Sequence, residues 1–192
     1  MPFENPTYGD IEKGYYGTVN GMITNSDLDN AMNMSQGSLL DSAGTDITFH
    51  KFIHKGRILY IPNRPIRHSI SWDHIQDNDG VKGKVITIGG RKYLVRLMTG
   101  SIHYDEGGNS SSVAGGEWTD LFEEFHESNG GPLSDADVYI SGDGSWTWCQ
   151  EVHSSNLARR VRRGSGSVSA FSYNTSSHTI SGRGWRPVLE EL

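Results

Sequence analysis

The sequence contains one cysteine, Cys149, among 192 residues. A single cysteine can form no internal disulfide and no cysteine-based zinc site. No run approaches the roughly 18 apolar residues that span a bilayer, and the first residues lack the basic start and apolar core of a signal peptide. We therefore expect a protein made in a reducing cytoplasm, without membrane insertion.

Hydrophobic residues are also scarce, at 34% of the chain, compared with about 45–50% in typical soluble domains. Glycine is abundant instead, with 24 residues, against an average share of about 7%. This composition excludes a coiled coil or a helical bundle and favours many short strands joined by glycine turns. The chain is nevertheless long enough to bury a core.

Lys and Arg are absent from residues 97–156, which carry eleven acidic residues. Ten Lys or Arg and three Asp lie in 51–96, and six Arg and two Glu in 157–192. The net charge of -6 therefore averages blocks of opposite sign, which can attract one another within a fold or between subunits. We expect the Arg cluster at 159–163 to pair with the acidic block, and we expect no nucleic-acid partner.

The pattern divides the chain into two parts and predicts the α+β class. Residues 1–45 are polar, with one short helical pattern beginning at a Ser26 cap, and predict an extended N-terminal arm suited to docking. Residues 46–192 predict short antiparallel strands with a few short helices, because strand–helix–strand alternation is absent. One of these helices is expected in SISWDHIQ, with Ser71 as its cap. The turn between the strands at 84–88 and 92–98 is Gly89-Gly90, a typical hairpin loop.

An amphipathic helix is predicted in the segment GEWTDLFEEFHESNGG. Trp118, Leu121 and Phe122 recur at helical spacing and predict its buried side, whereas Glu117 and Asp120 are expected to face solvent. His50 and His54 are expected as exposed residues on one face of a strand, too far apart to share a metal.

Residues 164–182 have the composition of an adaptable recognition loop, in which small residues supply hydrogen bonds and rigid aromatic rings supply contact area. Trp146 and Trp148 alternate on one predicted strand and would share a face. A plain surface hairpin over core tryptophans is the alternative interpretation. The candidate ligand-binding residues are Phe171, Ser172, Tyr173, Asn174, Thr175, His178 and Trp146.

No cofactor or catalytic residue is expected. Cys149 has no clear base partner and is expected to be a buried, inert thiol. A weak calcium candidate is the acidic loop with Asp135, Asp137 and Asp143, because calcium favours clustered carboxylates. A solvated acidic loop without an ion is the alternative.

The C-terminal third reads SWTWCQEV, then RRVRRGSGSVSAFSYN, then GRGWRPVLEEL. In order and content these segments resemble a set of tailed-bacteriophage virion proteins. The middle of the chain is similar to them as well, in FHKFIHKGRILYIPNRPIRHSISWDHI, VITIGGRKYLVRLMTG and GGEWTDLF. The resemblance covers about residues 20–192.

The closing pattern also resembles the C-type-lectin-like domain of formylglycine-generating enzymes and of variable receptor-binding proteins of phages and bacteria. This resemblance implies that Gly184, Trp185 and Arg186 belong to the scaffold and that the stretch before them is a ligand-facing surface. Formylglycine-generating enzymes need a pair of active-site cysteines, so that activity is not implied for a chain with Cys149 alone.

The resemblance implies a phage virion structural protein, made in the host bacterial cytoplasm. Its expected partners are a host-surface glycan or cell-wall polymer, other virion proteins through residues 1–45, and further copies of itself in a homo-oligomer. The alternative is an architectural component without receptor binding, such as a head decoration, a head fibre, or a baseplate or tail protein.

Overall fold

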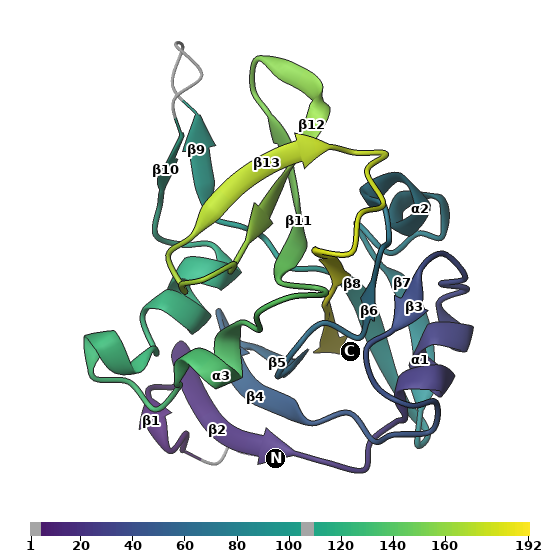
Figure 1. Cartoon of the computed structure of the whole chain (residues 1–192). Coiled ribbons are helices and arrows are strands. Elements are labelled where there is room, and N and C mark those ends of the chain that lie inside the picture. The colour runs from purple at the N-terminus through teal and green to yellow at the C-terminus, as the bar shows by residue number, and fades with distance from the viewer. Residues whose placement is uncertain (1–4, 105–109) are drawn as a thin grey trace.

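Strands, in which apolar and polar residues tend to alternate, are the main regular secondary structure of the chain. The computed structural model describes residues 5–104 and 110–192. Within these ranges the protein is mostly β, with two main sheets and a few short helices (Figure 1). The hairpin expected around Gly89-Gly90 is confirmed, and both glycines have positive φ, of 56° and 83°, which residues with a side chain seldom adopt.

The larger sheet is antiparallel throughout and runs through most of the chain's length. Its seven strands, in sheet order, are β1 (Tyr8–Gly9), β2 (Lys13–Val19), β4 (Phe49–His54), β5 (Arg57–Pro62), β15 (Pro187–Glu191), β8 (Arg91–Leu97) and β7 (Lys84–Ile88).

The second sheet has six strands and is mixed, because β11 and β14 run parallel. In sheet order its strands are β13 (Phe171–Thr175), β12 (Asn156–Arg163), β11 (Trp146–His153), β14 (Arg183–Trp185), β6 (Arg67–His68) and β3 (Ser38–Leu39). A separate hairpin joins β9 (Ile102–Tyr104) to β10 (Ser110–Ser112).

The helices are short and begin at polar caps. Thr24, two residues before the expected cap Ser26, caps α1: its side chain accepts from the Asp27 N–H. Ser71 caps α2 as predicted. The described helices are α1 (Asn25–Ala31), α2 (Trp72–Asp77), a π-helix (Trp118–Glu123), a 3-10 helix (Glu127–Asn129) and α3 (Asp135–Val138).

The N-terminal arm is the main correction to the predicted fold. β2 is an interior strand of the larger sheet and pairs with β4. Leu28 and Met32 on the following helix are fully buried in the core. The expectation of an extended arm over residues 1–45 is therefore wrong, because its apolar residues are needed to complete the sheet and the core.

Both faces of the larger sheet are covered by apolar side chains. One face packs with α1, α2 and part of the second sheet around Phe49, Trp148 and Trp185. The other packs with the π-helix through Phe52 and Phe122, whose ring centroids are 6.1 Å apart. Burial on two sides explains why several strands carry few outward polar residues.

Residues 183–191 connect the two sheets without a loop between them. β14 belongs to the second sheet and β15 to the larger one, and only Arg186 separates them. Arg186 is fully buried, and its Nε and Nη2 donate to the carbonyl oxygens of Pro62 at 2.6 Å and Asp137 at 2.8 Å. Its guanidinium also lies 4.5 Å from the centre of the Phe122 ring. Gly184 and Trp185 are buried beside it, in the scaffold.

Several polar residues expected on the surface lie inside. His50 and His54 are 1% and 2% exposed, and His54 contacts Asp120 at 2.9 Å. Glu117 is 3% exposed and forms an ion pair with the buried Arg96. Asp120 is 6% exposed. The expectation of exposed positions is wrong for His50, His54, Glu117 and Asp120, because both faces of the larger sheet are covered and the helix packs on one of them.

The burial of His50 predicts a pH-dependent stability. Burial, with a smaller effect from the charge of Arg186, lowers the pKa of His50 from 6.5 to about 4. In the unfolded chain His50 is protonated near pH 6.5, whereas in the folded protein it stays neutral down to about pH 4. The free energy of unfolding therefore falls as the pH drops from about 6.5 to about 4. The shift corresponds to a loss of about 3 kcal/mol over this range.

Urea unfolding at several pH values between 7 and 4 measures this effect. His50→Gln removes the titrating group and should flatten the profile relative to the unmodified protein, whereas His178→Gln, at an exposed position, should leave the slope unchanged. Equal slopes for the two variants would contradict the assignment.

Candidate functional site

The expected ligand-binding residues lie mainly on β13, an edge strand of the second sheet. β13 pairs antiparallel with β12. Successive side chains of a strand point to opposite faces. Ser172 and Asn174 therefore face one side of the sheet, and Phe171, Tyr173 and Thr175 face the other. The structure therefore places the expected ligand-binding residues of β13 on two opposite faces of the sheet.

Trp146 lies on the same face as Ser172, and Arg162 connects the two residues. The guanidinium of Arg162 lies 4.2 Å from the centre of the Trp146 ring, and its Nη2 donates to Ser172 Oγ at 3.2 Å. Arg160, two residues earlier on β12, stacks in the same way on Trp72, at 4.2 Å. Such contacts hold an arginine side chain flat against a ring.

Arg183 completes this group. Its Cα is the partner of Trp146 across the β11–β14 pairing, so its side chain leaves the sheet on the same side. The residue is only 6% exposed. We call Arg160, Arg162 and Arg183, with Trp72 and Trp146, the arginine–tryptophan face.

The arginines of this face have too few partners. Burial and the neighbouring charge of Arg183 lower the pKa of Arg162 to about 10, and burial lowers the pKa of Arg183. Within the described ranges, no carboxylate lies within ion-pair distance of Arg160, Arg162 or Arg183, and the buried Nε atom of each lacks a hydrogen-bond partner. Three cations held close together without counter-charge favour an anion at this face.

Within the described residues, the expected pairing of the Arg cluster with the acidic block is therefore correct for Arg163 alone. Arg163 is fully buried and forms an ion pair with Glu123 of the π-helix. Its guanidinium also lies 5.5 Å from the Trp118 ring centre and 5.9 Å from that of Phe171. This contact fastens β12 to the helix.

The opposite face of β13 has a smaller aromatic group. Tyr173 meets His153 edge to face, with ring centroids 4.5 Å apart, and Arg159 lies 4.9 Å from the Tyr173 ring centre. His178 lies beyond the strand and is exposed, and its backbone N–H donates to the Thr175 carbonyl at 3.1 Å. Tyr173 and His178 are therefore separate from the arginine–tryptophan face.

The three acidic residues of the calcium candidate each have a different partner. Asp137 accepts from the Ser134 N–H at 2.9 Å and closes the N-terminus of α3. Asp143 lies 3.9 Å from His68, and Asp135 lies 2.9 Å from His126. The structure does not bring Asp135, Asp137 and Asp143 together around one point, so their sequence clustering does not form a shared calcium site.

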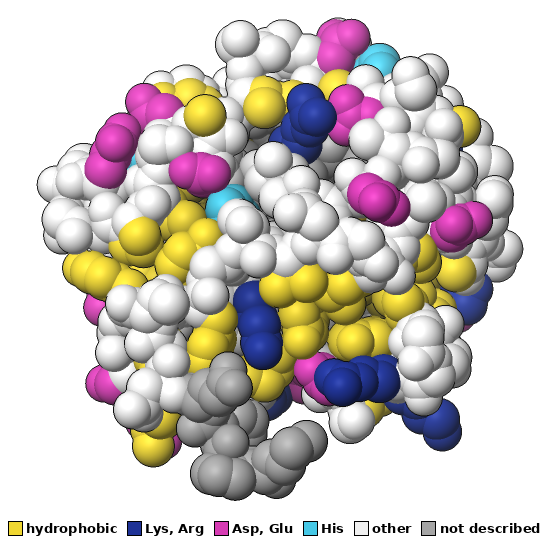
Figure 2. Space-filling model, turned by 90° about the horizontal axis from the view of Figure 1, so that it is seen from below, with side chains coloured by type: hydrophobic (Ala, Val, Ile, Leu, Met, Phe, Trp, Pro, Cys, Tyr) yellow, Lys and Arg dark blue, Asp and Glu magenta, His cyan; other side chains and the backbone are white. Residues whose placement is uncertain are grey.

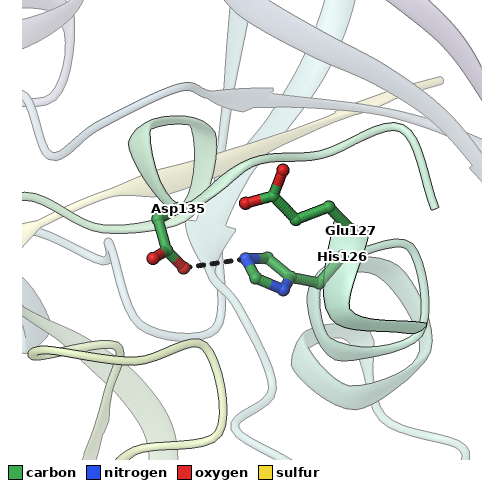
Figure 3. Close-up of side chains that lie close together, drawn as sticks. All are labelled: His126, Glu127 and Asp135. Atoms are coloured by element: carbon green, nitrogen blue, oxygen red, sulfur yellow. Dashed lines mark ion pairs between the residues drawn. The ribbon is translucent and has the colours of Figure 1, made fainter. Parts of the chain in front are cut away.

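Asp135 instead belongs to a group that the sequence interpretation missed, with His126 and Glu127 (Figure 3). One ligand atom from each residue lies within 4.8 Å of the others. The only signal in the sequence was the adjacent His126 and Glu127, because the loop that returns the chain to Asp135 cannot be read from spacing alone.

Cys149 is fully buried, as expected, and burial raises the pKa of its thiol well above the ordinary value. A protonated, inaccessible thiol is a poor nucleophile.

A groove lined by His54, Arg57 and Arg96 also contains the carboxylates of Glu117 and Glu190, which are hydrogen-bonded to Arg96. Arg96 Nη1 donates to Glu117 at 2.8 Å and Nη2 to Glu190 at 2.9 Å.

On the face of the molecule seen in Figure 2, apolar side chains gather with Lys and Arg among them. A shallow groove runs between the end of β2 and the turn that joins β7 to β8. It is lined by Val19, Gly21, Met22, Tyr60, Ile88, Gly89, Arg91 and Tyr93. This groove shares no lining residue with the arginine–tryptophan face and offers a second, more apolar surface.

No protein-family model, curated protein or solved structure matches this chain. In the part of the chain that the structure describes, no helix combines the length and the apolar composition needed to cross a membrane. Inference about function therefore depends on the surfaces described above.

The ion pair between Arg163 and Glu123 gives a stability prediction. Glu123→Gln leaves a buried guanidinium without its counter-charge and should lower the free energy of unfolding by about 3–5 kcal/mol. Glu124→Gln is the matched control: it breaks the partly exposed pair with Lys13 and should cost less than about 1 kcal/mol. Urea denaturation measures the free energy of unfolding of both variants. Equal losses would show that the buried pair stabilises the fold no more than the exposed pair.

Proposed function

We propose that this protein is a structural protein of a tailed-phage virion and acts as an adhesin. Its ligand is a negatively charged glycan or cell-wall polymer on the host surface. The observation that carries this proposal is the arginine–tryptophan face, where Arg160, Arg162 and Arg183 have no counter-charge within the described ranges. The virion assignment rests on the sequence resemblance over residues 20–192.

The chemistry of the face suits such a polymer. A guanidinium binds a phosphate or carboxylate oxygen through charge-assisted hydrogen bonds, often two at a time. The Trp146 ring, half-buried beside Arg162, offers an apolar plane for the C–H face of a sugar or polyol. Ser172 and Asn174, on the same side of β13, can read hydroxyl groups. Each site would bind weakly, and the many copies in a particle would supply avidity.

The C-type-lectin-like fold is part of the same proposal. It is supported by the sequence resemblance and by the burial of Gly184, Trp185 and Arg186 in the scaffold. It is also consistent with the position of the 164–182 segment, which forms the sheet edge before that scaffold strand.

The adhesin proposal predicts that Arg162→Gln weakens binding to host cells. Hydrogen bonds to charged groups contribute about 1.5–3 kcal/mol, so the loss should be about tenfold or more. Binding of the purified protein to intact cells, and to their isolated anionic polymer, measures it. Lys92→Gln is the control, since it removes one exposed charge from the other sheet.

Raising the salt concentration should weaken binding of the unmodified protein more than binding of Arg162→Gln. Equal binding by Arg162→Gln and Lys92→Gln would refute the role of this face. If binding were instead lost in Tyr173→Ala or His178→Ala, the ligand would lie on the opposite side of β13.

The architectural alternative is favoured by the apolar groove between the end of β2 and the turn that joins β7 to β8. Tyr60 and Tyr93 form its floor, and Ile88 lies at its edge, partly exposed. Such a surface suits contact with another virion protein or with a second copy of the chain. Docking through residues 1–45 would then use the part of β2 and its following turn that borders this groove.

Ile88→Glu tests this alternative. A charge at the groove edge should block incorporation into particles by at least tenfold while leaving the fold intact, because Ile88 is near a hairpin turn and is not fully buried. Quantifying the protein in purified particles measures incorporation, with Val85→Glu, on the same strand and 52% exposed, as control. Normal incorporation of Ile88→Glu would contradict a docking role for the groove.

A further inference from the structure

His126, Glu127 and Asp135 converge at a rigid loop beside the larger sheet (Figure 3). The chain turns back on itself after the π-helix: the Glu127 N–H donates to the Leu133 carbonyl at 2.7 Å, and the Leu133 N–H donates to the Phe125 carbonyl at 3.0 Å. Phe125 and Leu133 are 2% and 1% exposed and anchor both ends of the loop in the core. The positions of the three side chains therefore follow from a fixed backbone.

The imidazole of His126 is oriented as a metal ligand would be. The residue is 5% exposed. Its Nδ1 accepts from the Ser128 N–H at 3.3 Å and lies 2.9 Å from Ser128 Oγ. Its buried Nε2 has no hydrogen-bond partner and points toward the two carboxylates, 2.9 Å from Asp135 Oδ1 but outside hydrogen-bond geometry. Histidine ligands commonly bind a metal through one nitrogen while the other donates to a polar neighbour. With a metal on Nε2, the ring proton would be on Nδ1, which would donate to Ser128 Oγ in place of accepting from the Ser128 N–H.

The separations suit a small ion. Bonds of about 2.0–2.1 Å in tetrahedral geometry place ligand atoms roughly 3.3 Å apart. The three ligand atoms lie within 4.8 Å of one another, so small rotations of the exposed Glu127 and Asp135 side chains would close the site. Within the described residues, neither carboxylate forms an ion pair with Lys or Arg, and their mutual repulsion favours a cation between them.

The ligand set selects the kind of ion. One imidazole nitrogen and two carboxylates suit zinc and similar transition metals, whereas calcium prefers six to eight oxygen ligands. We propose that His126, Glu127 and Asp135 form a binding site for a divalent transition-metal ion such as Zn²⁺, with solvent at the fourth position.

The bound ion would join the 3-10 helix to the first residue of α3. The carbonyl oxygens of Asp137 and Val138, at the other end of α3, accept from the buried Arg186. Metal binding would thus stabilise the element that caps the connection between the two sheets. The proposal assigns a structural role and is independent of receptor binding.

Isothermal titration of the full-length, chelator-treated protein with ZnCl₂ tests the site. One equivalent should bind, and the melting temperature should rise with zinc concentration. Glu127→Gln should lower the affinity by at least about tenfold, since even changes around metal ligands commonly cost 10–100-fold. Glu127 is exposed, so this variant should fold. His126→Gln should abolish binding, and His178→Ala, which removes an exposed histidine elsewhere, should bind as the unmodified protein does.

Two further measurements identify the ion and the geometry. Co²⁺ should give the visible absorption bands of a tetrahedral site, and Glu127→Gln should lose them. CaCl₂ should produce no saturable heat at the same concentrations. The proposal is overturned if zinc does not bind, if Glu127→Gln and His178→Ala bind zinc equally, or if calcium binds as tightly as zinc.

Discussion

The structure depends on one buried cation at the point where the chain passes from one sheet to the other. Arg186 follows β14 directly and precedes β15, so its backbone links the two sheets. Its side chain is satisfied by carbonyl oxygens of Pro62, Asp137 and Val138 rather than by a carboxylate. Burial lowers the pKa of Arg186 to about 9, the cost of holding a charge there. The Arg186 guanidinium thereby joins the end of β5, the end of α3 and the β14–β15 connection, which are distant in sequence.

The same connection determines where the candidate surfaces lie. β14 brings Arg183 beside Trp146, and β11 and β12 extend the sheet to the edge strand β13. Arginines on one face therefore accumulate without acidic neighbours among the described residues, whereas Arg163 on the other face reaches Glu123. On one side of β12 Arg163 is ion-paired, and on the other side Arg160 and Arg162 have no counter-charge among the described residues. The arginine–tryptophan face is therefore a candidate binding site for an external anion.

Local elements were predictable where the signal was local. The Gly89-Gly90 hairpin and the Ser71 cap of α2 form as expected, because each depends on a few adjacent residues. The arm was not predictable, since β2 pairs with β4 across about thirty residues of intervening chain. The candidate site was only partly predictable: β13 was selected from composition, but its two-sided orientation depends on the register with β12.

The sequence by itself determined the many short strands with a few short helices, the burial of Cys149 and the concentration of arginine near the C-terminus, because composition and short-range spacing decide these properties. Only the tertiary structure decided which charges meet. His126 and Asp135 are brought together by a closed loop, and Arg163 is separated from Arg162 by the alternation of a strand. Electrostatic interactions fall off with distance in space, and distances between residues far apart in the sequence are set by the fold.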